Sequence, residues 1–194
     1  KISYAYFSKK ELTLQTSISE NFKDQIHDII ELKDEKIVAC SEDNSIIQGN
    51  LAVAAAKEKG LESQVYTVTD TNDIQSVTEK VVADGNDVVY IPTDNLLATY
   101  ISSVEAILSP AKIPSIVGEE GMCSGGGLAT YGINYYDLGK LAGQQALKIL
   151  KGEATAANTP VEYLPAEGCT LMINKAVAEK IGFEVPEKYK DAVQ

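Results

Sequence analysis

The stretch Val88-Val89-Tyr90-Ile91-Pro92-Thr93-Asp94-Asn95 decides the fold of this chain of 194 residues. An apolar run stops at a proline and is followed at once by Thr-Asp-Asn. A short apolar run bounded in this way is typical of a strand that is buried in a parallel sheet. We therefore expect a strand whose carboxyl end delivers polar side chains to the edge of a sheet, where ligands of open α/β folds bind.

The same alternation of strand and helix recurs on both sides of this stretch. Strands are expected at 36–40, 64–68, 87–91, 113–117 and 128–131, and helices at 44–59, 72–83, 94–108 and 134–151. Asn72 and Gln75 have the spacing of a capping box. Such alternation with short connections predicts an α/β fold with a Rossmann-like, mostly parallel sheet and helices on both faces.

The remaining segments carry weaker patterns. Residues 123–127 are rich in glycine and are expected to form a flexible loop. In the helix after Asn134, we expect an inward face made of Leu138, Leu141, Ala142, Ala146, Ile149 and Leu150. Two further strands are expected at 161–164 and 170–173, then a short helix capped by Asn174 and a polar tail.

Composition excludes one class of partner. The net charge is -11, and all 17 basic residues are lysines. Without arginine there is no bidentate group for phosphate or guanine, and an acidic surface repels nucleic acid. We therefore expect no nucleic-acid partner.

No run of eighteen apolar residues is present, so no membrane span is expected. The chain begins with Lys1, which suggests a processed or truncated product.

The cysteines and the single histidine give little support for catalysis. Cys40, Cys123 and Cys169 are widely spaced and lack the CxxC pairs of a structural zinc site. Cys123 is expected in the glycine-rich loop, where a thiol can react, but His27 lies far away in the sequence. We expect no catalytic residue, no metal ion and no cofactor.

Polar residues follow four of the expected strands, and we call this set of strand ends the rim. Its acids number six, with no lysine among them. The amino ends of the helices also meet there and favour negative charge. A ligand with an ammonium and a carboxylate satisfies both features, and a free amino acid is the simplest example. The candidate ligand-binding residues are Ser41, Glu42, Asn44, Ser45, Thr93, Asp94, Asn95, Glu119 and Glu120, and the rim also includes Asp43, Thr69 and Asp70.

Three other interpretations stay open from the residues alone. Asp94, like Asn72 and Asn134, has a residue type that commonly caps a helix without any ligand. An acidic rim also suits a magnesium-dependent phosphoryl-transfer or hydrolase enzyme, although no phosphate-binding motif or nucleophile elbow occurs. A ligand-sensing domain of a regulator on the same fold would need a DNA-binding region that this chain lacks.

Five segments, in the same order, closely resemble the substrate-binding proteins of a bacterial ABC-transporter family. Its members are thought to bring in tryptophan, tyrosine or related aromatic amino acids. The resemblance runs from about Phe22 to Val185. It rests on 41–50 (SEDNSIIQGN), 66–75 (YTVTDTNDIQ), 90–95 (YIPTDN), 118–121 (GEEG) and 132–139 (GINYYDLG).

The resemblance implies a type I periplasmic binding protein, in which two Rossmann-like lobes close on a ligand. This chain resembles the carboxyl-terminal lobe: an amino-terminal segment with a lead-in helix (1–33), the lobe with crossover strands near 160–173 (34–182), and a tail (183–194). It implies that the candidate residues occupy cleft-facing loops. Our hypothesis is that Glu42, Asp94 or Glu119 holds the ligand's ammonium, and that the hydroxyls and N–H groups at Ser45 and Asn95 hold its carboxylate.

The resemblance also implies where the protein works and with what. It implies binding without catalysis, a membrane permease as partner, and an extracytoplasmic location, periplasmic or as a cell-surface lipoprotein. Because one lobe supplies about half of a cleft, we also expect self-association that covers the open edge.

Overall fold

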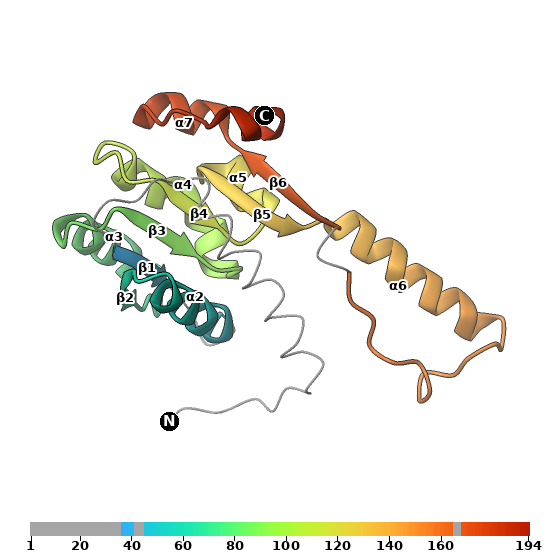
Figure 1. The fold of residues 1–194 in the computed structure, drawn as a ribbon. Coiled ribbons are helices and arrows are strands. Elements are labelled where there is room, and N and C mark those ends of the chain that lie inside the picture. Colours follow the sequence, from blue (N-terminus) through green and yellow to red (C-terminus); the bar gives the residue numbers. More distant parts are fainter. Residues whose placement is uncertain (1–35, 41–44, 165–167) are drawn as a thin grey trace.

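A computed structural model describes residues 36–40, 45–164 and 168–194 of the chain (Figure 1). A six-stranded sheet has the order β2-β1-β3-β4-β5-β6, and only the β5–β6 pair is antiparallel in this described part. The predicted α/β fold is therefore confirmed. The strands are β1 (Lys36–Cys40), β2 (Glu62–Tyr66), β3 (Val88–Ile91), β4 (Ser115–Val117), β5 (Ala129–Ile133) and β6 (Cys169–Ile173).

Helices cover both faces of the sheet. They are α2 (Ile46–Glu58), α3 (Asp73–Ala83), α4 (Asn95–Leu108), α5 (Glu120–Gly125), α6 (Tyr135–Leu150), α7 (Lys175–Ile181) and the 3-10 helix η2 (Glu187–Ala192). Buried residues of α2 and α7 share one core cluster, and those of α3, α4 and α5 share the other.

The strand β3 lies in the middle of the sheet and contributes to both clusters. All four of its residues are buried, and it pairs in parallel with β1 and β4. Val88 and Tyr90 face the α2 and α7 side, whereas Val89 and Ile91 face the other side. Burial of each such side chain contributes roughly 1.5–3 kcal/mol. The prediction that this stretch is a buried central strand is confirmed.

The glycine-rich stretch at 123–127 is not the flexible loop that we predicted. Its first three residues belong to α5, which ends at Gly125 and has Gly126, with φ of 148°, as its C-cap. A Cβ atom at Gly127 would lie 2.6 Å from Val117 Cγ1, so this glycine allows the chain to pack closely on β4. Cys123, predicted as a loop thiol, is fully buried.

The helix α6 departs most from the prediction, because it extends away from the sheet (Figure 1). None of its residues is buried within the described part of the chain. Leu138, Leu141 and Ile149 are half-buried, and the other members of the predicted inward face, Ala142, Ala146 and Leu150, are exposed. The inward packing predicted for this face is therefore wrong for the described residues.

The segment after α6 runs back along the helix. Gln145 Nε2 donates a hydrogen bond to the Pro160 carbonyl oxygen at 3.1 Å. The strand predicted at 161–164 is not formed: these residues are irregular, and Val161 is 66% exposed. The physical reason is that a strand needs a hydrogen-bonded neighbour, and the described sheet uses β6 at the edge next to β5.

The helix caps were only partly predicted. Asn134 caps α6 and Asn174 caps α7, as expected. The capping box at Asn72 and Gln75 is wrong, because the Asn72 side chain forms no cap hydrogen bond within the described residues. Instead, the carboxylate of Asp73, the first residue of α3, accepts hydrogen bonds from the backbone N–H and the hydroxyl of Thr69.

The segment 183–194, predicted as a polar tail, packs on the lobe. Five of its apolar or aromatic side chains contact the α2 and α7 cluster. The Gln194 N–H donates to the Ile173 carbonyl at 2.9 Å, which holds the segment beside β6.

Candidate functional site

The rim is formed where β1, β3 and β4 end. These strands are parallel neighbours, so the loops that follow them share one edge of the sheet. Of the candidate residues, Ser41, Glu42 and Asn44 lie outside the described part of the chain. Ser45, Thr93, Asp94, Asn95, Glu119 and Glu120 are described, and they come from three different loops.

Ser45 and Asp94 form a buried pair beneath the rim. The Ser45 hydroxyl donates to Asp94 Oδ2 at 2.8 Å, and Asp94 Oδ1 accepts from the Leu97 N–H at 2.9 Å. Asp94 is therefore the N-cap of α4, so its capping interpretation is confirmed. Ser45 is 0% exposed and Asp94 is 2% exposed. The pair joins the start of α2 to the start of α4.

Thr93 joins the three loops at the surface. Its backbone N–H donates to Gln48 Oε1 at 2.8 Å, and its hydroxyl donates to the Gly118 carbonyl at 3.3 Å. A Cβ atom at Gly118 would lie 2.3 Å from the Thr93 backbone nitrogen, so only glycine permits this approach. Gln48 thus belongs to the rim, although we did not predict it. The available signal was its place in the quoted segment 41–50, three residues after Ser45.

Glu119 and Glu120 lie at the start of α5, and both are half-buried. The Glu119 carboxylate accepts from the Gly121 N–H at 2.7 Å and from the Met122 N–H at 2.5 Å. It therefore caps α5. The cap gives Glu119 a structural role in addition to its place among the candidate ligand-binding residues.

The remaining rim residues are more open. Asn95 begins α4 with an exposed side chain. Asp70, at the outer end of the rim, accepts a hydrogen bond from the Asn72 N–H at 2.7 Å within its own exposed loop. Asp70 therefore organises its own turn next to the edge strand β2.

Tyr135, the first residue of α6, brings an aromatic ring to the rim just after β5. A Cβ atom at Gly132 would lie 3.3 Å from Glu119 Cα, so the end of β5 passes close to the glutamate. Partial burial and the nearby negative charge of Glu119 raise the pKa of the Tyr135 hydroxyl. Tyr135 is 55% exposed, which leaves much of its ring accessible beside Glu119.

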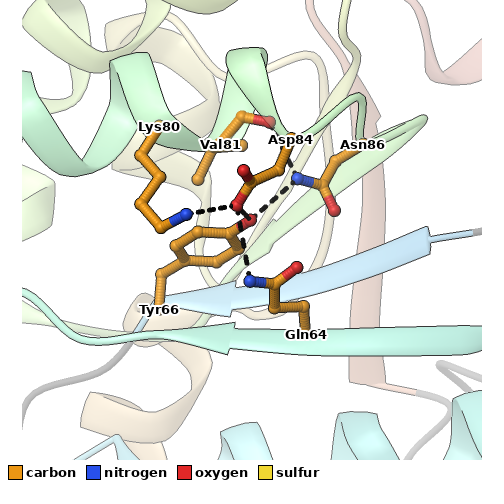
Figure 2. A network of polar contacts seen from close by, with 6 residues as sticks. All are labelled: Gln64, Tyr66, Lys80, Val81, Asp84 and Asn86. Carbon is orange, nitrogen blue, oxygen red and sulfur yellow. Dashed lines mark hydrogen bonds and ion pairs between the residues drawn. The ribbon is translucent and has the colours of Figure 1, made fainter.

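A second polar network lies between β2 and the end of α3 and has a structural role (Figure 2). Asp84 Oδ2 accepts from the Tyr66 hydroxyl and, at 2.7 Å, from Lys80 Nζ, while Asn86 Nδ2 donates to the Val81 carbonyl. The Lys80 hydrogen bond is the main reason why the pKa of Asp84 is lowered. Burial chiefly raises the pKa of Tyr66. The network fastens α3 to the sheet.

Two further features are absent from the described residues. No group of three or more histidine, cysteine, aspartate or glutamate side chains is arranged there to hold a metal ion. No helix there is long and apolar enough to cross a membrane.

A parallel sheet with polar strand ends defines an α/β domain of the kind that binds small ligands at its carboxyl edge. The family model described as ABC transporter substrate binding protein matches residues 20–192. The chain belongs to this family. The resemblance found in the sequence is thereby confirmed, and the enzyme and regulator interpretations are not favoured.

Individual relatives agree with this assignment. The chain is 35% identical over 124 residues to a tyrosine-binding protein of Clostridioides difficile (strain R20291), a match that covers 64% of this chain and 35% of that protein. The structure of an ABC domain in complex with L-Trp from Streptococcus pneumonia has a TM-score of 0.75 and 28% identity, covering 93% of this chain and 60% of the other.

A ligand-free, open structure is also similar. It is that of a substrate binding protein with adhesive properties from Clostridium difficile, with a TM-score of 0.65 and 30% identity, and it covers 84% of this chain and 54% of the other. The chain thus spans 35% of the curated relative and little more than half of the two solved chains.

Proposed function

We propose that this chain forms the carboxyl-terminal lobe of a solute-binding protein that presents an aromatic amino acid to an ABC importer. The support from relatives is direct: one is named for tyrosine, and a solved one holds L-Trp. The observation that supports the proposal is the rim, where neighbouring strand ends carry a half-buried carboxylate (Glu119), a second acid (Glu120) and an exposed amide (Asn95), and where the accessible ring of Tyr135 lies near Glu119.

Hydrogen bonds within the protein order the described part of the rim before a ligand binds. Ser45, Asp94 and Thr93 tie the three loops together through hydrogen bonds that do not involve any ligand. A binding site that is ordered in advance loses less entropy when the ligand arrives. We assign these three residues the role of supporting the rim, and we keep Asn95, Glu119 and Glu120 as direct ligand contacts.

The ligand's two charges would be held separately. Glu119 and Glu120 suit the ammonium, because their carboxylates accept hydrogen bonds and complement a positive charge. The start of α2 suits the carboxylate, because the amino end of a helix is favourable for negative charge. Ser41, Glu42 and Asn44, which precede that helix, remain proposed contacts.

The helix α6 supports a site shared between two lobes. It begins just after β5, whose Gly132 lies beside Glu119, and it carries exposed apolar side chains away from the described lobe. A second lobe would cover this helix and close over the rim. Function then consists of hinge closure around the ligand and delivery to a membrane permease, without catalysis. The protein would work outside the cytoplasmic membrane, in the periplasm or as a lipoprotein.

Calorimetry with the full-length protein tests this function. L-Tryptophan and L-tyrosine are expected to bind as 1:1 complexes, and Glu119→Gln is expected to weaken them about tenfold or more through loss of a charged hydrogen bond. The glutamine keeps an oxygen that can cap α5. Lack of binding of every aromatic amino acid to the wild-type protein would contradict the proposal.

A further inference from the structure

The amide of Gln48 has a fixed orientation. A backbone N–H can only donate, so the Gln48 atom that lies 2.8 Å from the Thr93 nitrogen must be the oxygen Oε1. The amide is planar, so Nε2 and its two N–H groups point away from that contact. No acceptor in the described part of the chain takes up these two donors, and the side chain is partly exposed.

The two hydroxyl donors described at the rim are already engaged. The Ser45 hydroxyl donates to buried Asp94, and the Thr93 hydroxyl donates to the Gly118 carbonyl. Glu119 and Glu120 only accept when they are ionised. A ligand carboxylate placed among these acids needs hydrogen-bond donors, since unpaired negative charges would repel it.

We infer that Gln48 binds the carboxylate of the amino acid through Nε2, while its Oε1 holds the Thr93 loop. This inference rests on the proposed function and adds a specificity-determining residue to it. Thr93 contacts Gln48 on one side and Gly118, the neighbour of Glu119, on the other. A ligand lying over Thr93 would therefore meet an amide donor at its carboxylate end and acids at its ammonium end.

A single substitution separates the two tasks of Gln48. Gln48→Glu keeps an oxygen that accepts from the Thr93 N–H, but it replaces the donor group with a negatively charged acceptor. Asn50→Asp is the matched control, because it makes the same change of charge on the same helix at an exposed residue.

The test is calorimetry of full-length wild-type, Q48E and N50D proteins with L-tryptophan, L-tyrosine and their carboxamides. The carboxamides keep the ammonium and the ring but carry no negative charge. For Q48E, we expect affinity for the amino acids to fall at least tenfold, with a much smaller change for the carboxamides. N50D should bind the amino acids and their carboxamides with the same affinity as the wild type. The thermal midpoint of Q48E should stay close to that of the wild type.

Three outcomes would overturn the inference. If Q48E binds L-tryptophan as the wild type does, Gln48 does not contact the carboxylate. If Q48E loses affinity for the amino acids and for their carboxamides to the same extent, Gln48 acts only by holding the Thr93 loop. If the wild-type protein binds neither amino acid, the proposed function fails and this inference fails with it.

Discussion

The Ser45 hydroxyl lies 2.8 Å from Asp94 Oδ2, and both side chains are almost completely shielded from solvent. The two residues are 49 positions apart, so the hydrogen bond connects the loop before α2 to the loop before α4. Asp94 is a buried carboxylate, and its two oxygens accept hydrogen bonds from Ser45 and from the Leu97 N–H. Its contribution to binding would come through the geometry of its neighbours Thr93 and Asn95.

Removal of this hydroxyl should destabilise the lobe. We expect Ser45→Ala to lower the free energy of unfolding by about 1–3 kcal/mol, because a buried carboxylate loses a donor. Urea denaturation followed by circular dichroism measures this change. Ser76→Ala, which removes an exposed hydroxyl from α3, should cost less than about 0.5 kcal/mol. Equal stability of both variants would contradict the role of the Ser45–Asp94 pair.

Glu105 should make the stability of the lobe depend on pH. It is 4% exposed, and burial raises its pKa from 4.5 to about 7, although hydrogen bonds from Ser115 and Ser109 oppose the change. An acid with a raised pKa in the folded state stabilises the protein most below its unfolded pKa, and this contribution is lost as pH rises through about 7. The loss is on the order of 3 kcal/mol.

Substitution of Glu105 tests this dependence. Glu105→Gln cannot ionise, so its stability relative to the wild type should be higher at pH 8 than at pH 5. Thermal midpoints measured at the two pH values give the comparison. Glu153→Gln, at an exposed site, should show no such difference. A pH-independent effect of Glu105→Gln would mean that the carboxyl does not titrate in this range.

Cys123 should react slowly with thiol reagents. Burial raises the pKa of its thiol to about 12, so almost no thiolate is present at pH 8. Cys169 is partly exposed. We expect iodoacetamide to modify Cys169 well before Cys123 in the native protein, as followed by peptide mass spectrometry. Comparable rates at both sites would contradict the burial of Cys123.

The exposed residues of α6 should contribute little to the stability of this lobe. Leu150 is 84% exposed, whereas Leu108 of α4 is 1% exposed. We expect Leu150→Ala to change the free energy of unfolding of the 194-residue chain by less than about 0.5 kcal/mol. Leu108→Ala should cost about 2–5 kcal/mol. Urea denaturation measures both, and a large loss for Leu150→Ala would show that this lobe covers the helix.

The sequence predicts those features that depend on neighbouring residues. The apolar run 88–91 identified the central strand, and the alternation of elements identified the sheet. Contacts between distant residues were missed: Gln48 and Thr93 are separated by 45 positions, and no local pattern shows that they meet. The pattern in α6 indicates that a face is apolar, but it does not indicate which surface covers that face.

Composition at 119–127 was misleading for the glycines and ambiguous for the glutamates. Glycines at 125–127 suggested mobility, but Gly127 is required by the close approach to Val117. Adjacent glutamates suggested a ligand, but a glutamate can also accept hydrogen bonds from the first N–H groups of a helix, as Glu119 does. Glycine occurs both in mobile loops and at close contacts, and glutamate occurs both at ligand sites and at helix caps. Only the geometry distinguishes these roles.

The position of Gln194 has a practical consequence for attaching the protein to a surface. Its N–H bonds to Ile173, which pairs with Ala129 at the amino end of β5. Gln194 is therefore held at the edge of the sheet opposite the rim. A tag or dye joined after Gln194 would start from a fixed point, leaving the ligand edge directed toward the solution in immobilised binding assays.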